Sequence, residues 1–301
     1  MMKIIFCQDP MSADTPDSMY IDEVAAATHA GLSFELLDYG AIADYHNAAR
    51  AVRDIPVHET TELAIYRGWI LRATQYEALY NALLSRGLRL LNTPEQYRYA
   101  QHLPEALALI KAHTPRTVFM ATDGQNLSYD AIMQLLIPFA GQALILKDYV
   151  KSAKHYWYQA THISSASDET AVRNTVEHFL KIRGDSLEGG LVFREFVNFK
   201  ELAEHPRSRM PLIKEYRLFF LHGKRIDTVR YWDIDGYDEN DRPPDDLFAD
   251  LARQVKSQFF TMDVAQRPDG TWMIIELGDA QVAGLPDSTD RDRFYKSLAG
   301  L

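Results

Sequence analysis

Two acidic residues near the end of the chain lie side by side if the strands that carry them pair as their sequences predict. Asp269 and Gly270 form a dipeptide typical of a two-residue hairpin turn, and an extended apolar pattern lies on each side of it. Counting back two by two from that turn places Asp263 opposite Glu276. Directly opposed like charges destabilise a sheet, so this pairing needs a chemical reason.

A divalent cation between the two carboxylates would supply that reason. Mg²⁺ is commonly bound by one or two carboxylates together with the phosphates of a substrate. Asp279, just past the end of the last strand, is a candidate further ligand. The alternative is that Asp263 and Glu276 both face solvent at the edge of a sheet, and the spacing alone leaves both interpretations open.

A group of basic residues in the middle of the chain suits a polyphosphate. Lys147 ends the apolar strand candidate LILK, and Lys151, Lys154 and His155 follow in a loop-like segment with aromatic neighbours. Cations placed in this way can offset the charge of a transferring phosphoryl group. The alternative is a strand-end lysine whose amino group reaches water beside a solvated basic loop. No Walker-type phosphate-binding loop (GxxxxGK followed by Ser or Thr) occurs in the sequence.

Arginines follow in a second predicted hairpin, whose turn is His222-Gly223. That turn places Glu215 opposite Arg230 and puts Arg217 on the same face of the sheet. The planar guanidinium of arginine suits phosphate oxygens. The alternative is a cross-strand ion pair on the surface.

One arginine of the first part of the chain is a candidate for substrate binding. Arg67 lies at the end of a strand candidate in the sequence YRGW. There it could bind a substrate carboxylate. The alternative is a surface arginine that packs on Trp69.

The order of the predicted elements indicates a mixed α/β and α+β fold. In residues 1–94, strands and helices alternate, which is typical of a Rossmann-like domain. We expect a second domain over residues 95–301. Within it, residues 115–188 are predicted to form a small subdomain with the lysine and the basic loop, and residues 189–301 a mostly antiparallel sheet with the acids.

The composition argues against several classes of function. The chain has 301 residues, 47% of them hydrophobic, so it can bury a sizeable core. A formal net charge of −10 argues against a general nucleic-acid-binding surface or an anionic-membrane surface. The single cysteine allows no internal disulfide, and the first apolar run is too short for a signal peptide or a membrane span. We therefore expect a cytoplasmic protein.

Taken in order, these parts resemble the ATP-grasp superfamily over most of the chain. LILK is similar to the strand that carries its nucleotide lysine, and LVFREFV to its adenine hinge. EYRLF resembles its arginine strand, and the pair MDV and IIELGD its metal-binding strands. Within the superfamily, the segments YRGWILRATQYEALYNALLSRGLRLLNTPEQY and IIELGDAQVAGLP resemble the clade named for two arginines and one lysine.

The resemblance implies a nucleotide site. Lys147 should contact the phosphates of ATP, and Glu195, Phe196 and Val197 should form the hinge that holds adenine, mostly through backbone groups. Arg194, next to the hinge, is one candidate for the two arginines of the clade.

The resemblance also implies the catalytic and metal groups. Arg217 is the second candidate for a clade arginine, with Arg230 as a third, and Lys154 belongs to a loop that closes over the reacting groups. The implied magnesium ligands are Asp263, Glu276 and Asp279. The family usually has an asparagine two residues after the glutamate, whereas this chain has glycine at position 278.

The activity implied by the resemblance is an ATP- and Mg²⁺-dependent ligation of a carboxylate to an amine through an acylphosphate. The partners would be small-molecule substrates, such as an amino acid or a peptide. Two alternatives stay open, namely a phosphotransferase on the same scaffold and a non-catalytic nucleotide-binding or interaction module.

Overall fold

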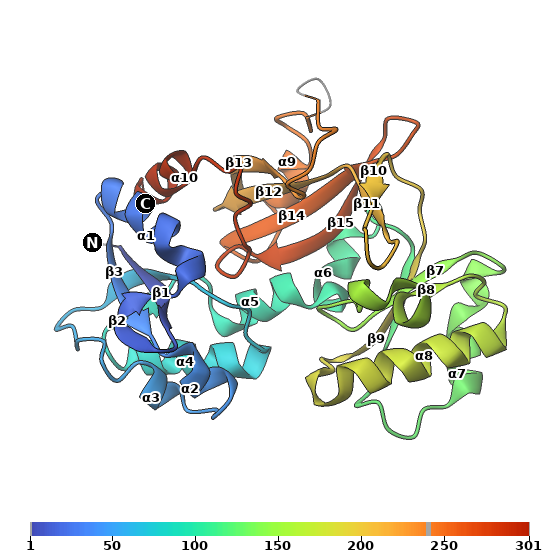
Figure 1. Cartoon of the computed structure of the whole chain (residues 1–301), viewed down its shortest axis with the longest axis horizontal. Helices are drawn as coiled ribbons and strands as arrows, with labels where there is room; N and C mark the ends of the chain where they lie inside the picture. The colour runs from blue at the N-terminus through green and yellow to red at the C-terminus, as the bar shows by residue number, and fades with distance from the viewer. Residues whose placement is uncertain (1, 239–241, 301) are drawn as a thin grey trace.

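The computed structural model describes residues 2–238 and 242–300 of the chain. Within these residues the strands form three larger sheets and one two-stranded ribbon. Figure 1 shows the N-terminal sheet at one end of the molecule, the sheet near residue 190 at the other, and the C-terminal sheet between them on one side. Among the described residues, no helix combines the length and the apolar character needed to span a membrane. The predicted mixed α/β and α+β fold class is confirmed.

The N-terminal sheet has four parallel strands in the order β3-β1-β4-β5, and a short strand, β2, pairs antiparallel with the end of β1. The strands are β1 (Lys3–Asp9), β2 (Ser12–Pro16), β3 (Ser33–Leu37), β4 (Glu62–Arg67) and β5 (Leu88–Leu90). The connecting helices are η1 (Ser18–Tyr20), α1 (Ile21–His29), α2 (Tyr39–Ala43), α3 (Ala48–Ala51) and α4 (Ala73–Leu84). The last helix of the chain, α10 (Arg291–Ala299), packs its buried side chains into the same core.

The second sheet is antiparallel and has the order β6-β9-β7-β8. Its strands are β6 (Thr117–Ala121), β7 (Leu144–Lys147), β8 (His162–Ile163) and β9 (Gly190–Glu195). Its helical segments are α7 (Tyr129–Leu136), η2 (Ile137–Phe139), η3 (Lys154–Tyr156), η4 (Trp157–Thr161), α8 (Glu169–Arg183) and η5 (Gly184–Ser186). The sequence assigns residues 190–195 to the C-terminal subdomain, whereas β9 pairs here with β6 and β7. The predicted subdomain boundary at 188/189 is therefore corrected, and the domain boundary at residue 94 stays a prediction.

The third sheet is antiparallel and has the order β13-β12-β14-β15. Its strands are β12 (Glu215–Leu221), β13 (Lys224–Arg230), β14 (Phe259–Gln266) and β15 (Trp272–Asp279). A ribbon of β10 (Glu201–Glu204) and β11 (Pro211–Ile213) precedes it, and the short helix α9 (Ala249–Ala252) lies in the connection between β13 and β14.

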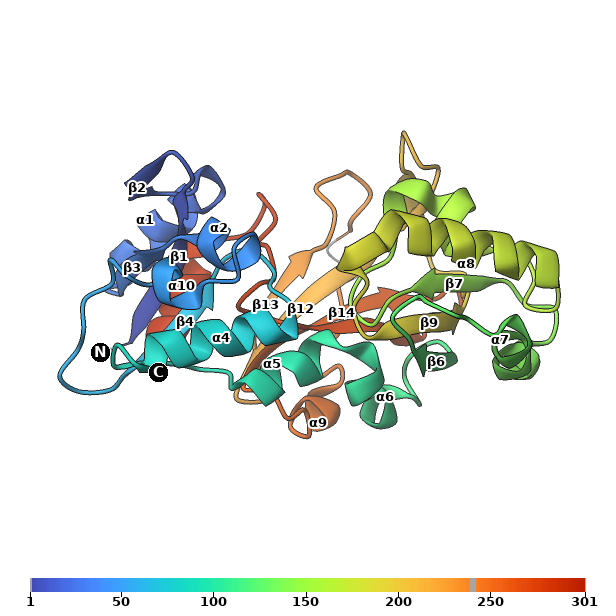
Figure 2. The same cartoon turned by 90° about the horizontal axis from the view of Figure 1, so that it is seen from below.

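Two helices explain which side of the third sheet faces a cavity. The helices α5 (Pro94–Gln101) and α6 (Leu103–Ile110) follow α4 along one side of the molecule (Figure 2). Their apolar side chains share a core with even-numbered residues of the sheet, such as Phe260, Met262 and Val264. Because side chains alternate between the two faces of a strand, the odd-numbered residues of β14 point to the opposite face.

Candidate active site

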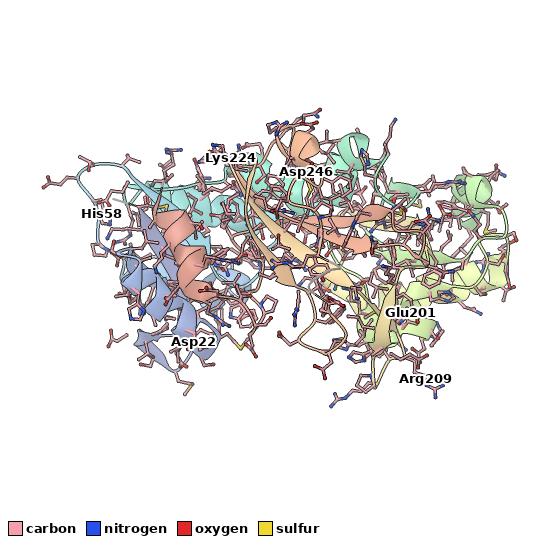
Figure 3. All side chains as sticks on the ribbon, turned by 90° about the horizontal axis from the view of Figure 1, so that it is seen from above. Asp22, His58, Glu201, Arg209, Lys224 and Asp246 are labelled. Atoms are coloured by element: carbon pink, nitrogen blue, oxygen red, sulfur yellow. The ribbon has the colours of Figure 1, made fainter. Side chains whose placement is uncertain are left out.

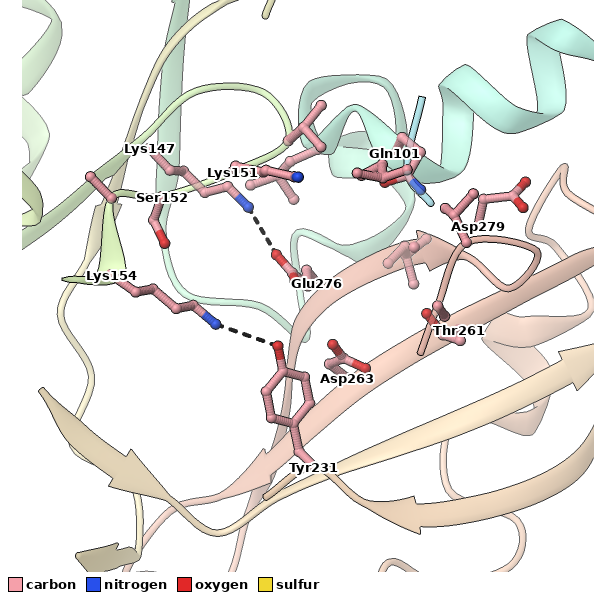
Figure 4. A pocket seen from close by; sticks show the side chains of 18 of the residues that line it. Gln101, Lys147, Lys151, Ser152, Lys154, Tyr231, Thr261, Asp263, Glu276 and Asp279 are labelled. Atoms are coloured by element: carbon pink, nitrogen blue, oxygen red, sulfur yellow. Dashed lines mark hydrogen bonds and ion pairs between the residues drawn. The ribbon is translucent and has the colours of Figure 1, made fainter. Parts of the chain in front are cut away.

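Three charged residues lie next to one another on the face of the third sheet that α5 and α6 leave uncovered. Arg217 of β12 pairs with Asp263 of β14, and Asp263 pairs in turn with Glu276 of β15. The predicted pairing of the two acids is confirmed. They border a cavity of about 450 Å³ together with Lys147 and Lys154 (Figure 4).

The predicted pairing is right although the predicted turn is wrong. The connection is longer than two residues, because Arg267 N donates to the carbonyl of Thr271 at 2.8 Å, and Gln266 pairs with Trp272. If the strands continued from this pair without a bulge, Asp263 would lie opposite Ile275 instead of Glu276. An extra residue at Ile275 then forms a bulge between the pairs Val264–Ile274 and Asp263–Glu276 and restores the pairing.

Each of the two acids is paired with a cation. Arg217 donates from Nε and Nη2 to the two oxygens of Asp263 at 2.8 and 2.7 Å, and Lys147 Nζ donates to Glu276 Oε2 at 2.9 Å. Burial alone would raise the pKa of Glu276, but Lys147 and then Lys154 outweigh it and lower the pKa to about 2. Glu276 is therefore a carboxylate at neutral pH. Burial raises the pKa of Asp263, against the opposing effect of Arg217.

Lys154 lies on the other side of the same cavity, at the start of η3. Its Nζ is 3.5 Å from the hydroxyl of Tyr231 and lies over the rings of Tyr231 and Trp232, at 5.3 and 5.7 Å from their centroids. Burial alone would lower the pKa of Lys154, but Tyr231 and Glu215 outweigh it and raise the pKa. Lys154 therefore keeps its positive charge beside the paired acids.

Glu215 is a buried carboxylate to which the sequence assigned no role of its own. It lies two residues before Arg217 on β12 and is 3% exposed. Burial, opposed mainly by Lys154, raises its pKa to about 8. The period-two spacing of Glu215 and Arg217 was the sequence signal that could have marked it as part of the site.

The predicted hinge lines a second, more apolar cavity of about 140 Å³. Glu195, Phe196 and Val197 border it, and Phe196 N donates to the carbonyl of Ala143 at 2.9 Å, which fixes the chain there. Large side chains that the sequence did not single out complete its wall, namely Trp157, Met210 and Trp232. The two cavities share lining residues, which are Lys147, Ser152, Lys154 and Glu276. A ligand with a flat apolar part and a charged part can therefore occupy both at once.

Arg194 borders the apolar cavity, but its guanidinium is bonded to protein groups. It donates to the carbonyl of Ile275 at 2.6 Å, to Thr114 Oγ1 at 2.7 Å and to Thr117 Oγ1 at 3.3 Å. Burial lowers its pKa to about 10. These contacts tie β9 to the bulged residue of β15 and position the strand that carries Glu276. A direct contact of Arg194 with nucleotide stays a prediction.

Arg230 does not lie with the other candidates. The predicted turn is confirmed, because Leu221 pairs with Lys224. However, an extra residue at Ile226 shifts the pairing, so that Arg230 lies opposite Tyr216 instead of Glu215. A one-residue shift moves a side chain to the other face of a sheet. The predicted position of Arg230 on the face of Arg217 is therefore wrong.

Tyr231 takes the place that the predicted register gave to Arg230. Its ring centroid lies 4.8 Å from the guanidinium carbon of Arg217, and its hydroxyl is the partner of Lys154. Burial and the nearby charges of Glu215 and Asp263 raise its pKa, although the largest single influence, Lys154, lowers it. Tyr231 is therefore a neutral hydroxyl between two cations of the cavity.

Asp279 lines the same cavity as the other two acids, but its carboxylate accepts several hydrogen bonds from the protein. It is fully buried and accepts from Asn92 Nδ2 at 2.6 Å, from Gln281 N at 2.9 Å and from Gln281 Nε2 at 3.1 Å. Burial raises its pKa to about 7. In residues 2–238 and 242–300, no group of three or more His, Cys, Asp or Glu side chains is arranged to hold a metal ion. Asp279 as a magnesium ligand therefore stays a prediction, and its side chain joins the end of β15 to Asn92, just past β5.

Arg67 is a buried structural residue and does not reach the cavity as a substrate ligand. It is 1% exposed, forms two hydrogen bonds to Glu23 at 2.9 and 3.0 Å, and Tyr295 donates to the same carboxylate at 2.5 Å. It also donates to the carbonyls of the loop after β15, those of Ala280, Gln281 and Ala283, at 2.6, 3.3 and 2.9 Å. Both interpretations of Arg67 drawn from the sequence are therefore wrong.

Asp263 and Glu276 fit a magnesium ion that arrives with a nucleotide. They are adjacent and border the cavity of about 450 Å³. Arg217 neutralises Asp263 and Lys147 neutralises Glu276, and both cations can also bind phosphate. Mg²⁺ bound by two carboxylates commonly completes its coordination with substrate phosphates and water.

Gly278 offers no side-chain ligand where the family usually has asparagine. It lies opposite Thr261 in β14, and a Cβ atom at this position would lie 2.9 Å from Thr261 Oγ1. The side chain of Thr261 therefore occupies the space that a longer residue at 278 would need.

Comparisons with known proteins agree with this geometry. A family model matches residues 140–298, and it describes the ATP-grasp domain of family 3 in the clade named for two arginines and one lysine. The chain belongs to this family. The predicted superfamily and clade are confirmed, and a comparison with curated protein sequences found no match.

Solved structures of similar fold cover nearly the whole chain. D-cycloserine synthetase DcsG has a TM-score of 0.60 at 15% identity, covering 100% of this chain and 99% of its own. A RimK domain ATP-grasp protein from Sphaerobacter thermophilus DSM 20745 has a TM-score of 0.59 at 13% identity, covering 100% and 98%. The ATP-grasp ligase PsnB, in complex with a phosphomimetic precursor variant, Mg and ADP, has a TM-score of 0.54 at 13% identity, covering 99% and 95%. At these identities, the likeness concerns the fold.

Proposed function

We propose that this ATP-grasp protein is an ATP- and Mg²⁺-dependent ligase that joins a carboxylate to an amine through an acylphosphate. The observation that carries the proposal is the pair of joined cavities. An apolar cavity lined by the hinge meets a polar cavity at Lys147, Lys154 and Glu276. Adenine suits the first, and the phosphates with the reacting groups suit the second.

In this proposal, each charged group of the polar cavity has a role. Lys147 and Lys154 bind phosphate oxygens, and Arg217 offsets the charge of the transferring phosphoryl group. Magnesium held by Asp263 and Glu276 would supply further charge neutralisation.

The reaction needs no nucleophilic side chain. An oxygen of the substrate carboxylate attacks the γ-phosphorus of ATP, and the bond to the β-phosphate oxygen breaks, giving an acylphosphate and ADP. The amine then attacks the acyl carbon, loses a proton and releases inorganic phosphate. The segment 151–155, which borders the polar cavity, would keep water away from the acylphosphate.

The substrates follow from the same reasoning. DcsG is described as a synthetase and PsnB as a ligase that was solved with a precursor. For this chain we propose an amino acid, a peptide or another small carboxylate, an amine acceptor, and a cytoplasmic site of action where ATP and Mg²⁺ are available.

The test is release of ADP from Mg·ATP with panels of carboxylates, with and without amines. A ligase releases ADP and free phosphate in proportion to the amide formed. A phosphotransferase instead forms ADP and a stable phosphorylated product without any amine. No ADP release with any carboxylate would leave the nucleotide-binding module as the better interpretation.

Two variants make this test specific to the proposed site. Glu276→Gln and Asp263→Asn should each remove ADP release under conditions where circular dichroism shows that the variant is folded. Glu201→Gln, at an exposed position of β10 (Figure 3), is the matched control and should react like the wild type. Turnover that survives in both site variants would remove the metal assignment.

A further inference from the structure

The cavity of about 450 Å³ that holds Asp263 and Glu276 adjoins a further polar cavity. That further cavity has a volume of about 260 Å³ and lies between the helices α2 and α4 and the end of α8. The two cavities share the lining residues Ile70, Val150, Lys151 and Arg183. A substrate longer than a single carboxylate group can therefore extend from Asp263 and Glu276 past Lys151.

Two charged residues that line this extension, Arg183 and Glu188, each have a partner close by. Arg183 forms an ion pair with the fully buried Asp148 at 2.7 Å, and His102 Nε2 lies 3.0 Å from Glu188. The contact with Arg183 offsets the charge of Asp148.

Two cations of the extension have no such partner. Within the part of the chain that the structure describes, the amino group of Lys151 makes no hydrogen bond or ion pair, and Arg72 has no carboxylate at ion-pair distance. Arg72 donates instead to the backbone carbonyl of Asp185. In Figure 4 the amino group of Lys151 lies on the Gln101 side of the cavity, apart from Asp263.

The surroundings of Lys151 favour an anion. Burial and, next to it, the nearby charge of Arg183 lower the pKa of Lys151, and the carboxylates of Asp148 and Glu188 oppose them only in part. An anionic group bound beside it would offset this repulsion, and hydrogen bonds between ions are stronger than those between neutral groups.

We propose that Lys151, with Arg72, binds a second anionic group of the substrate at a distance from the carboxylate that reacts. The substrate class is then a dicarboxylic acid, or an acidic peptide, whose non-reacting carboxylate lies in the extension. This inference rests on the proposed function, because it takes the reacting end to lie at Asp263 and Glu276.

The experiment compares α,ω-dicarboxylates from four to ten carbons with the monocarboxylates of equal length. Binding is measured by calorimetry on the full chain loaded with Mg·AMPPNP, and again without nucleotide. Lys151→Gln removes the charge at an exposed position and should not disturb the fold. Lys224→Gln is the matched control, since Lys224 is exposed at the start of β13 (Figure 3) and borders none of these cavities.

The wild type should bind at least one diacid about tenfold more tightly than the matched monoacid. Lys151→Gln should lose that preference, and Lys224→Gln should keep it. Phosphonocarboxylates of the same lengths show whether a phosphate-like group binds better than a second carboxylate. The proposal would be overturned if diacids and monoacids bound equally at every length, or if no diacid bound. It would also be overturned if Lys151→Gln kept the preference for a diacid. Binding of AMPPNP itself is measured first, so that a failure of the nucleotide site is recognised separately.

Discussion

Replacing Arg67 tests whether the loop at residues 280–283, which follows β15, is held by the N-terminal sheet. In the Arg67→Met variant, the buried carboxylate of Glu23 loses both hydrogen bonds from the guanidinium and keeps only the one from Tyr295. The carbonyls of the loop at 280–283 lose their donor as well. Removing one partner of a buried ion pair costs about 3–5 kcal/mol of unfolding free energy, because the other charge is left without compensation.

Urea unfolding followed by circular dichroism measures this effect. Arg50→Met is the matched control, because the side chain of Arg50 is 49% exposed and lies 3.8 Å from Asp38. It should change the unfolding free energy by less than about 1 kcal/mol. The double variant Arg67→Met/Glu23→Gln should lose less stability than the sum of the single variants, since it no longer buries an unpaired charge.

The outcome also separates structure from substrate binding. We expect AMPPNP affinity in Arg67→Met to stay near that of the wild type under conditions where the variant is folded. An unfolding free energy within about 1 kcal/mol of the wild type, together with lost binding of carboxylates, would refute the structural role and return Arg67 to the substrate site.

Three further variants test particular side chains of the site. The pKa of Glu215 is about 8 in the folded state against an ordinary value of 4.5, so Glu215 adds stability below pH 4.5 that falls as pH rises and is gone above about pH 8. The variant Glu215→Gln should therefore flatten the profile of melting temperature against pH between these values. An unchanged profile would contradict the raised pKa. Lys147→Ala should weaken AMPPNP binding by about tenfold or more, measured by calorimetry, because Glu276 then faces the phosphates without its cation; an unchanged affinity would count against the phosphate role. Gly278→Asn should lower the melting temperature, and adding Thr261→Ala should recover part of the loss; equal melting temperatures for Gly278→Asn and the wild type would show that the strands adapt.

Local sequence patterns predicted the parts of the site that depend on strand order. Lys147 and the acids Asp263 and Glu276 follow from apolar strands that carry charged residues, whereas the hinge follows only from the resemblance to the ATP-grasp superfamily. Alternation along β14 also places its odd-numbered charges on the face away from the core, as the structure shows.

Bulges set the limit of that reasoning. The extra residue at Ile226 moves Arg230 to the other face, and the one at Ile275 corrects an error in the predicted turn by chance. A bulge depends on packing around both strands, so it leaves no clear mark in the residues that form it.

Contacts between distant segments set a second limit. Asp279 is held by Asn92, 187 residues earlier in the chain, and Arg67 by Glu23 and by carbonyls more than 200 residues away. Their residue types suit metal or substrate binding equally well. Only the fold shows that their hydrogen bonds are already satisfied within the protein.

The measurement that tests the central claim most directly is calorimetric titration with AMPPNP, with and without Mg²⁺, on the wild type, Glu276→Gln and the control Glu201→Gln. The wild type and the control should bind AMPPNP about tenfold or more tightly with Mg²⁺, and Glu276→Gln should lose this dependence on the metal. An absence of AMPPNP binding in the wild type, or a Mg²⁺ dependence that survives in Glu276→Gln, would contradict an ATP site built on this pair of acids.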